Sequence, residues 1–418
     1  MLLYKLLLFC YPRIAKILGF FNIKAKQWSE GQAHVWEEIY TLKQKINAPV
    51  IWVHTASYGE FEQGLPIIEK LKKDYPNYQI WLTFFSPSGY LHRKSDQSVD
   101  AVSYMPIDSF DHANRFLDII QPKLILFIKY EFWYHYLDQA NKKDIPIILV
   151  SALFRKNQLF FKWYGRFYRK MINKFNYVLV QEMTSFELIK PIIDPSKLYL
   201  TGDTRFDRVS QTAQTFIDFP WMKPIQSKPV LIAGSTWDSD HALIAQTITY
   251  TPSLNWIIVP HHVDEKSINK CKSYFNNCIT LSQLEQQEAN LHPQAQNVLI
   301  IDRIGLLRSL YQVATLCYVG GGFTKDGIHN VLEPAAFSKP VIWGSNDSKY
   351  REAIGLMKAG GGKKITDSKS LIYALLKLLN DKVAYEKMAT SAGNYIATHT
   401  GATEKTIQLI QEKRLLTN

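Results

Sequence analysis

Short apolar runs recur along the whole chain, and polar or amphipathic stretches separate them. An apolar run of four to eight residues between turn signals is typical of a strand buried on both faces. The stretch 61–73 has apolar residues at Leu65, Ile68 and Leu71, which is the spacing of an amphipathic helix. This alternation predicts parallel sheets covered by helices. The predicted strands are 50–54, 80–84, 124–128, 145–150, 177–180, 230–233, 255–259, 298–301, 316–319 and 341–343.

The pattern is interrupted after residue 200 by a stretch with Pro220, Pro224 and Pro229, and it restarts at residue 230. A chain of 418 residues suits two domains of about 200 residues each. We therefore predict an α/β protein of two Rossmann-like domains that face each other across a cleft. The predicted parts are a membrane-anchoring segment 1–27, a first domain 28–208, a linker 209–228 and a second domain 229–418 with a terminal helix.

The composition is that of a well-packed protein, with 46% hydrophobic and 21% charged residues. Its four cysteines lack the paired spacing of a zinc site, which favours a reducing compartment. The net charge of +12 is compatible with nucleic acid, anionic lipid or a phosphorylated substrate.

The first 26 residues are apolar, with Lys5, Arg13, Lys16 and two further lysines spaced through them. Lys5 and the pair Pro12-Arg13 interrupt any run long enough to span a bilayer, and no cleavage site of small residues follows. The segment is typical of a helix lying on an anionic membrane surface. The alternative is an ordinary first helix buried in the core.

The stretch 318–343 carries the densest candidate chemistry, with a triple glycine at 320–322 followed by His329, Asn330 and Glu333. Glycines let backbone amides approach a phosphate, and a helix start adds a positive dipole end. A carboxylate one turn inside the helix can accept hydrogen bonds from the hydroxyls of a ribose. The alternative is a glycine turn between two core strands.

Two acids follow predicted strands of the first domain. Gly59 would allow a sharp turn that places Glu60 at a helix start, where it can act as a general base or simply cap the helix. Glu131 follows the strand 124–128 among aromatic residues, which suit either sugar stacking or a core.

Further polar groups follow strands of the second domain. Ser235 and Thr236 offer amides and hydroxyls to a phosphate, and Pro260 and His261 end the strand 255–259. No acidic cluster stands in a phosphate loop, which argues against a required divalent ion. A fixed cation such as Arg205 could take the place of a metal on a leaving phosphate.

In their order along the chain, these segments resemble the 3-deoxy-D-manno-octulosonic acid (Kdo) transferases. The likeness covers nearly the whole chain and rests on HTASYGE (54–60), KYEFW (129–133), GDTRFD (202–207), AGST (233–236), PHH (260–262) and 320–334. It implies the two-domain GT-B fold and transfer of Kdo, with inversion, from CMP-Kdo to the lipid A precursor lipid IVA. It further implies that no metal or cofactor is needed and that the enzyme works at the cytoplasmic face of the inner membrane.

The resemblance also implies roles for single residues. Glu60 is expected to be the general base, and Glu131 is expected to stabilise the transition state. Arg205, where the family usually has Lys, is the expected cation on the phosphate. The expected substrate contacts are Ser57, Gly59, Ser235, Thr236, Pro260, His261, Arg303, Ile304, Gly305, Gly321, Gly322, His329, Asn330, Val331, Leu332 and Glu333. Tyr134 and Val331 depart from the family pattern. Leu306 lacks the acid that is usual in the family, so only backbone contacts are expected around 303–306.

The expected partners are thus CMP-Kdo, the lipid A precursor and an anionic membrane surface, and not nucleic acid. Two alternatives stay open. One is another GT-B enzyme, such as a UDP-sugar transferase or an epimerase. The other is a non-catalytic basic protein that binds nucleic acid.

Overall fold

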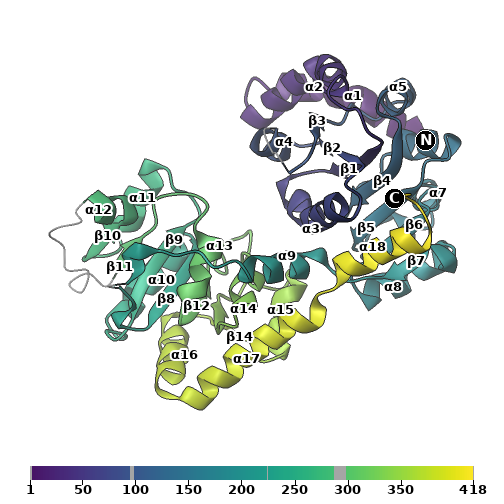
Figure 1. The fold of residues 1–418 in the computed structure, drawn as a ribbon. Helices are drawn as coiled ribbons and strands as arrows, with labels where there is room; N and C mark the ends of the chain where they lie inside the picture. Colours follow the sequence, from purple (N-terminus) through teal and green to yellow (C-terminus); the bar gives the residue numbers. More distant parts are fainter. Residues whose placement is uncertain (1, 95–97, 224, 287–297, 418) are drawn as a thin grey trace. The chain divides into compact units, whose positions relative to one another are not determined.

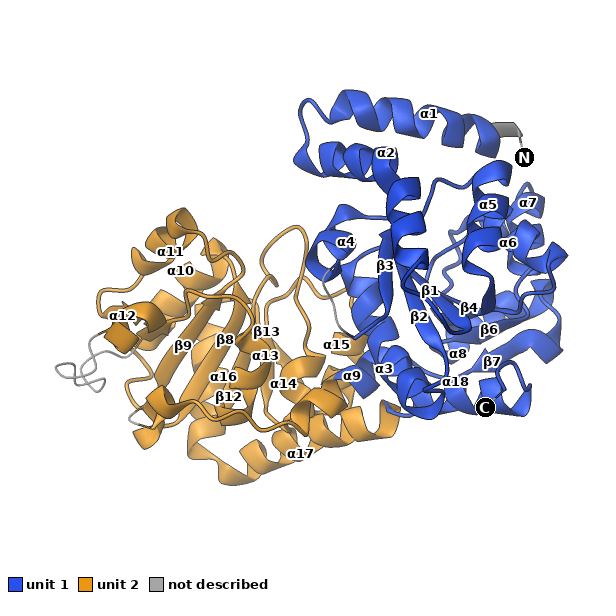
Figure 2. Ribbon diagram, turned by 45° about the horizontal axis from the view of Figure 1, so that its top comes forward, with its two compact units in different colours: residues 1–208, 400–418 blue, residues 209–399 orange. Residues whose placement is uncertain are grey.

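The computed structural model describes residues 2–94, 98–223, 225–286 and 298–417. It divides into two compact units, which are described separately here. Unit 1 comprises residues 1–208 and 400–418, and unit 2 comprises residues 209–399 (Figure 2). Both units are parallel α/β layers, so the predicted fold class is confirmed (Figure 1).

The described part of unit 1 is built on a parallel sheet of seven strands with the spatial order β3-β2-β1-β4-β5-β6-β7. Strand order reverses between β1 and β4, the point at which open α/β sheets bind ligands beyond the carboxyl ends of the strands. The strands are β1 (Val50–Thr55), β2 (Gln79–Phe84), β3 (Ala101–Tyr104), β4 (Pro122–Ile128), β5 (Ile147–Ala152), β6 (Tyr177–Val180) and β7 (Leu198–Leu200).

Alternate residues of these strands point to opposite faces, and each face has its own core. Trp52 and Trp81 belong to one core, whereas Ile51 and Leu82 belong to the other. The helices of unit 1 are α1 (Leu2–Leu18), α2 (Ile23–Lys43), α3 (Tyr58–Asp74), α4 (Pro87–Arg93), α5 (Phe110–Ile120), α6 (Tyr134–Lys142), α7 (Arg166–Ile172), α8 (Met183–Ile189) and α18 (Ala402–Glu412).

The described part of unit 2 repeats this plan with the order β10-β11-β9-β8-β12-β13-β14, which reverses between β8 and β12. Its strands are β8 (Val230–Thr236), β9 (Asn255–Pro260), β10 (Cys278–Thr280), β11 (Val298–Ile300), β12 (Leu316–Val319), β13 (Val341–Trp343) and β14 (Gly362–Lys364). Its helices are α10 (Asp238–Ile248), α11 (Glu265–Lys272), α12 (Leu281–Gln286), α13 (Leu307–Leu310), α14 (Leu332–Ala336), α15 (Arg351–Lys358), α16 (Ser368–Asn380) and α17 (Lys382–His399).

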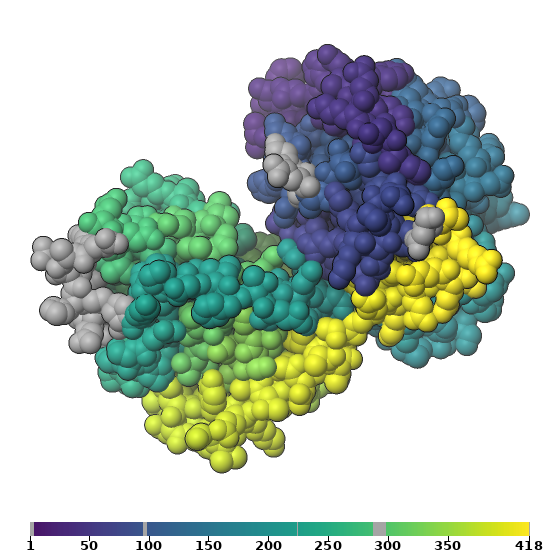
Figure 3. Space-filling view, in the orientation of Figure 1, coloured from purple at the N-terminus to yellow at the C-terminus, as the bar shows by residue number. Residues whose placement is uncertain are grey.

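The ends of the two units differ from the predicted domain limits. Helix α9 (Thr204–Ala213) crosses the boundary at residue 208. Residues 209–228, predicted as a linker, belong to unit 2, where Phe219, Met222 and Ile225 are buried in the core. Residues 400–418, predicted with the second domain, belong to unit 1. There α18 packs against α3, as the yellow end of the chain beside the purple-blue segment shows (Figure 3). Its residues Ile407, Leu409 and Ile410 join the sheet core.

The N-terminal segment forms a helical hairpin of α1 and α2. Pro12 lies inside α1 without ending it. One side of α1 packs, since Ala15 is buried and the Tyr4 hydroxyl donates to Asp108 at 2.5 Å. The other side is exposed, and nine large apolar side chains of the hairpin are at least half exposed to solvent: Leu6, Leu7, Phe9, Ile14, Ile17, Leu18, Phe20, Phe21 and Ile23. The hairpin is thus not the ordinary buried first helix that was the alternative.

Among the described helices, none combines the length and the apolar character that crossing a membrane requires.

Candidate active site

Glu60 lies in the first turn of α3, just beyond the carboxyl end of β1. Ser57 is the residue that precedes the helix, and its hydroxyl donates a hydrogen bond to a carboxylate oxygen of Glu60. Both side chains are partly exposed. The carboxylate is therefore oriented by Ser57 at the positive end of the helix dipole and remains accessible to a ligand.

Gly59 does not form the predicted sharp turn. Because α3 begins at Tyr58, Gly59 is already helical, and it is not among the glycines with positive φ. A Cβ at this position would meet only the Ser57 Oγ, at 3.8 Å. Gly59 therefore does not provide a turn. Because it has no side chain, the space next to Ser57 stays open.

Glu131 follows β4 and is buried, with 6% of its surface exposed. Its Oε2 lies 3.0 Å from His54 Nε2 and accepts a hydrogen bond of 2.6 Å from Trp133 Nε1. On the other side of the imidazole, His54 Nδ1 lies 2.8 Å from the Thr83 hydroxyl, which also accepts from Trp52 Nε1 at 2.8 Å. The Thr83 hydroxyl can donate to Nδ1 while Nε2–H donates to Glu131, so both ring nitrogens of His54 have a hydrogen-bond partner.

Glu60 and Glu131 thus follow the two strands, β1 and β4, between which the order of the sheet reverses. The sequence placed both acids at strand ends, but it assigned no role to His54. The signal available was its position as a polar residue in the strand Val50–Thr55, where every residue is buried.

Arg205 lies at the start of α9, and Asp203 fixes its guanidinium. Asp203 Oδ2 accepts from Arg205 Nε at 2.9 Å and lies 2.8 Å from Nη2, and Oδ1 accepts from the Arg205 backbone amide at 2.9 Å. The sequence predicted a fixed cation at this position. The structure adds a neighbouring carboxylate that offsets part of its charge.

In unit 2, the residues at the carboxyl ends of β8, β9 and β12 come together. Trp237 stacks on His261, with ring centroids 4.6 Å apart, and His261 stacks on His329 at the same distance. Trp237 Nε1 donates a hydrogen bond of 2.9 Å to His329 Nε2. Burial lowers the pKa of His329 to about 4, with a smaller contribution from His261, and burial also lowers the pKa of His261. These residues form a neutral, flat-sided cluster of the kind on which a nucleobase can stack.

Ser235 and Thr236 are at this same edge. Ser235 has φ of +52° at an irregularity of β8, and Thr236 is buried with its hydroxyl 2.8 Å from His241 Nε2. Pro260 ends β9, and the next amide, that of His261, donates to the Thr236 carbonyl at 2.9 Å.

The triple glycine serves close packing of the backbone. A Cβ on Gly320 would lie 2.4 Å from the Ser235 carbonyl oxygen, and one on Gly322 would lie 2.4 Å from Gly344 Cα. Gly321 has φ of +89°, and a Cβ there would lie 2.4 Å from the Gly327 carbonyl oxygen. Close packing of the backbone therefore accounts for all three glycines, and their contact with a phosphate stays a prediction.

Asp240 connects the segment that follows β8 to the end of β12 and the glycines after it. The sequence did not suggest this role. Its carboxylate is fully buried and accepts from the Tyr318 hydroxyl at 2.6 Å, from the Gly321 amide at 2.9 Å and from the Trp237 amide at 2.9 Å. Burial raises the pKa of Asp240, and these hydrogen bonds oppose the rise.

The segment 330–333 leads into α14. Asn330 Oδ1 accepts from the Leu332 amide at 3.0 Å, and Asn330 Nδ2 donates to Glu333 Oε1 at 3.2 Å. Arg308, which the sequence did not single out, lies 3.5 Å from the same carboxylate oxygen. Val331 and Leu332 are buried in the core, so contacts of these two with a ligand would be limited to the backbone.

The segment 303–305 follows β11 and is open to solvent. Arg303 pairs with Glu285, Ile304 is 85% exposed, and Gly305 has φ of +95° with no atom within 4 Å of a Cβ.

The architecture of both units defines the fold class of the protein. An epimerase that binds UDP-GlcNAc, from Neisseria meningitidis, matches with a TM-score of 0.59 and 17% identity, covering 87% of this chain and all of that one. A glycosyltransferase from Rickettsia africae matches with a TM-score of 0.57 and 13% identity, over 89% of this chain and all of that one. These likenesses concern the fold alone, which is that of GT-B proteins.

The sequences identify the family. A family model of 3-deoxy-D-manno-octulosonic-acid transferases matches residues 32–208. The enzyme of that name from Aquifex aeolicus is 30% identical over 79% of this chain and 86% of its own length. The one from Haemophilus influenzae is 26% identical over 97% of this chain and 96% of its own. The chain belongs to the Kdo transferase family and is a glycosyltransferase.

Proposed function

We propose that the enzyme transfers Kdo from CMP-Kdo to the lipid A precursor lipid IVA, a step in building lipopolysaccharide, at the cytoplasmic face of the inner membrane. The observation that carries the proposal is the match to Kdo transferases along nearly the whole chain. The geometry of the carboxyl edges of the two sheets supports the assignment of roles.

Glu60 is the proposed general base. Its carboxylate stands at a helix start, is oriented by Ser57 and is partly exposed. As the acceptor hydroxyl attacks the anomeric carbon of Kdo, its proton passes to Glu60, the new C–O bond forms and the bond to CMP breaks. This single displacement inverts the configuration at that carbon.

Glu131 is the proposed electrostatic partner of the transition state. A sugar that loses its leaving group develops oxocarbenium character, which a nearby carboxylate stabilises. His54 and Trp133 keep the Glu131 side chain in place, so little reorganisation accompanies the change in charge. We keep Arg205, oriented by Asp203, as the cation for the leaving phosphate.

The proposed donor site is the cluster of Trp237, His261 and His329 with Ser235 and Thr236 beside it. The flat rings suit the cytosine base, and amides at the strand ends suit the phosphate. Asn330 and Glu333 are proposed for the ribose. Since the proposed phosphate ligands are amides and one arginine, the reaction should proceed in the presence of a chelator.

The acceptor is an acylated, phosphorylated disaccharide held in a bilayer. The exposed apolar side chains of the hairpin α1–α2, together with its lysines, are proposed to hold the enzyme on an anionic membrane surface.

The test is the Glu60→Gln variant, assayed with CMP-Kdo and lipid IVA by mass spectrometry of the products. We expect kcat to fall at least a hundredfold, which is within the range for loss of a general base. Glu69→Gln, on the same helix, is the matched control and should retain activity. Near-normal turnover of Glu60→Gln would remove Glu60 from this role. If UDP, and not CMP, competes for the nucleotide site of the wild-type enzyme, the result would favour a UDP-sugar enzyme.

A further inference from the structure

A groove of about 320 Å³ lies in unit 1 between α1, α2 and the loop that follows β2. Its walls are mostly apolar and include Tyr11, Ile14, Leu18, Trp28 and Phe85, with Lys24 among its few polar groups. Its volume is within the range of sites for small ligands. Ile14, Leu18 and Lys24 belong to the proposed membrane-binding surface, but no role assigned above uses the interior of the groove.

A series of aromatic contacts connects this groove to the candidate active site. Tyr11 packs on Trp28 with centroids 4.9 Å apart, and both contact Phe85 at 5.7 Å. Phe85 packs on Trp133 at 4.8 Å, and Trp133 donates to Glu131. The same loop is bonded to the β1 end, because the Ser86 amide donates to the Ala56 carbonyl at 2.7 Å. One wall of the groove therefore belongs to the loops that position the two acids.

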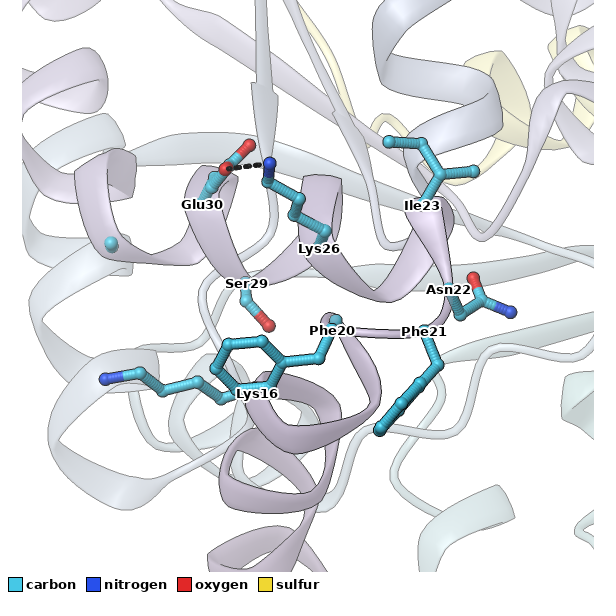
Figure 4. A pocket seen from close by; sticks show the side chains of 10 residues that line it. Lys16, Phe20, Phe21, Asn22, Ile23, Lys26, Ser29 and Glu30 are labelled. Carbon is cyan, nitrogen blue, oxygen red and sulfur yellow. Dashed lines mark ion pairs between the residues drawn. The ribbon is translucent and has the colours of Figure 1, made fainter.

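The outer end of the groove lies at the turn between α1 and α2. Asn22 lines both the groove and a second cavity of about 710 Å³, which Phe20, Phe21 and Ile23 also line (Figure 4). Phe20 and Phe21 are 83% and 89% exposed. The lysines of this turn are Lys16 and Lys26 beside the second cavity and Lys24 beside the groove.

The charged side chains of this region are mostly positive, and Glu30, beside the second cavity, pairs with Lys26 at 3.9 Å. The first acidic residue of the chain is Glu30, so residues 1–29 carry only positive charges. An apolar groove with lysines at its outer end is complementary to a lipid that has acyl chains and a phosphate.

We propose that this groove binds an acyl chain of the acceptor, with the acceptor's phosphate near Lys24. The inference rests on the proposed function, since it assigns the groove to the same acceptor. The acyl chain would extend through the groove from the turn between α1 and α2 to Phe85. The disaccharide of the acceptor would then lie at the carboxyl edge of β1 and β4. The groove would thereby select acylated acceptors and position their hydroxyl.

The first experiment fills the groove. Ala25 lines it, so Ala25→Phe adds a ring inside, whereas Thr41→Phe adds a ring at an exposed site on α2 that lines neither cavity. We expect Ala25→Phe to raise KM for lipid IVA about tenfold, or about 1.4 kcal/mol, which is roughly the contribution of two buried methylene groups. KM for the fully deacylated disaccharide should stay unchanged, and Thr41→Phe should behave like the wild type.

Two outcomes of that experiment would overturn the proposal. Equal effects of Ala25→Phe and Thr41→Phe would mean that any ring added to the hairpin raises KM, whether or not it fills the groove. Equal losses with the acylated and the deacylated acceptor would mean that the ring disturbs the site and not an acyl chain.

The second experiment needs no turnover. A monomeric lipid phosphate with a brominated acyl chain should quench the fluorescence of Trp28, measured as the difference between wild type and Trp28→Phe. Inorganic phosphate should not compete. Absence of this quenching would refute the binding of an acyl chain in the groove, even if Kdo transfer is confirmed. Quenching in a protein that does not transfer Kdo would instead refute the proposed function alone.

Discussion

Removal of the Asp207 carboxylate should loosen the last helix of the chain. Asp207, at the end of the GDTRFD segment, accepts hydrogen bonds from the amides of Gly401 at 2.6 Å and Thr403 at 2.7 Å. It also accepts from the Thr403 hydroxyl at 2.7 Å. A carboxylate 194 positions away in sequence therefore caps α18, and Asp207→Ala leaves that helix start without its acceptor.

The magnitude follows from these contacts. Hydrogen bonds to a charged group contribute about 1.5–3 kcal/mol each when buried, so three partly buried ones contribute on the order of 3 kcal/mol in total. The apolar face of α18 opposes release, because Ile407, Leu409 and Ile410 are at most 3% exposed. Burial of three such side chains contributes about 5–9 kcal/mol. The helix should therefore stay docked in the variant but open about a hundredfold more often.

Hydrogen exchange of peptides from α18 measures this opening. Asp207→Ala should accelerate exchange in α18, and Thr403→Val, which removes only the hydroxyl bond, should have a smaller effect. Amides of unit 2 should be unchanged and serve as the internal reference. If kcat falls while exchange in α18 is that of the wild type, Asp207 acts in the reaction and the capping role is refuted.

Three further predictions concern single side chains. Burial lowers the pKa of His241 from 6.5 to about 4, so the unfolded chain binds more protons between these values. The free energy of unfolding should then fall as pH drops from 6.5 to 4, by up to about 1.4 kcal/mol per pH unit, and His241→Gln should reduce this slope in denaturant titrations. Gly321→Ala should cost more stability than Gly305→Ala, because both glycines have positive φ but only Gly321 is enclosed; equal melting temperatures would contradict the packing role. His54→Phe should leave Glu131 without one of its donors and cost about 1–3 kcal/mol in unfolding experiments, together with a loss of kcat; a fully active and stable variant would show that the network is dispensable.

The sequence predicted the central strands of both sheets because each is an apolar run, even where the strand has only three residues, as in β11 and β13. It missed β3, β7, β10 and β14, which are the four edge strands. These strands have three or four residues each, and β14 reads Gly-Lys-Lys. Edge strands are half-covered and short, so they lack the apolar run by which a buried strand is found.

The candidate sites were predictable in position and less so in detail. Glu60 and Glu131 in unit 1, and His261 and His329 in unit 2, follow strands of their own sheet, as predicted, because parallel strands end at the same edge of a sheet. Their roles stay predictions. The reason for the glycines at 320–322 was not predictable, since only the fold shows that Ser235, Gly327 and Gly344 occupy the adjacent space. The partners His54, Asp240 and Arg308 were missed for the same reason: their contacts are distant in sequence.

The return of residues 400–418 to unit 1 has a consequence for synthesis on the ribosome. All of unit 2 is synthesised before the helix that completes one core of the first sheet. That core therefore cannot be completed until synthesis reaches residues 400–418, and Ile51 and Leu82 stay incompletely covered until then. Nascent chains stalled just before residue 400 should accordingly bind chaperones through their N-terminal half.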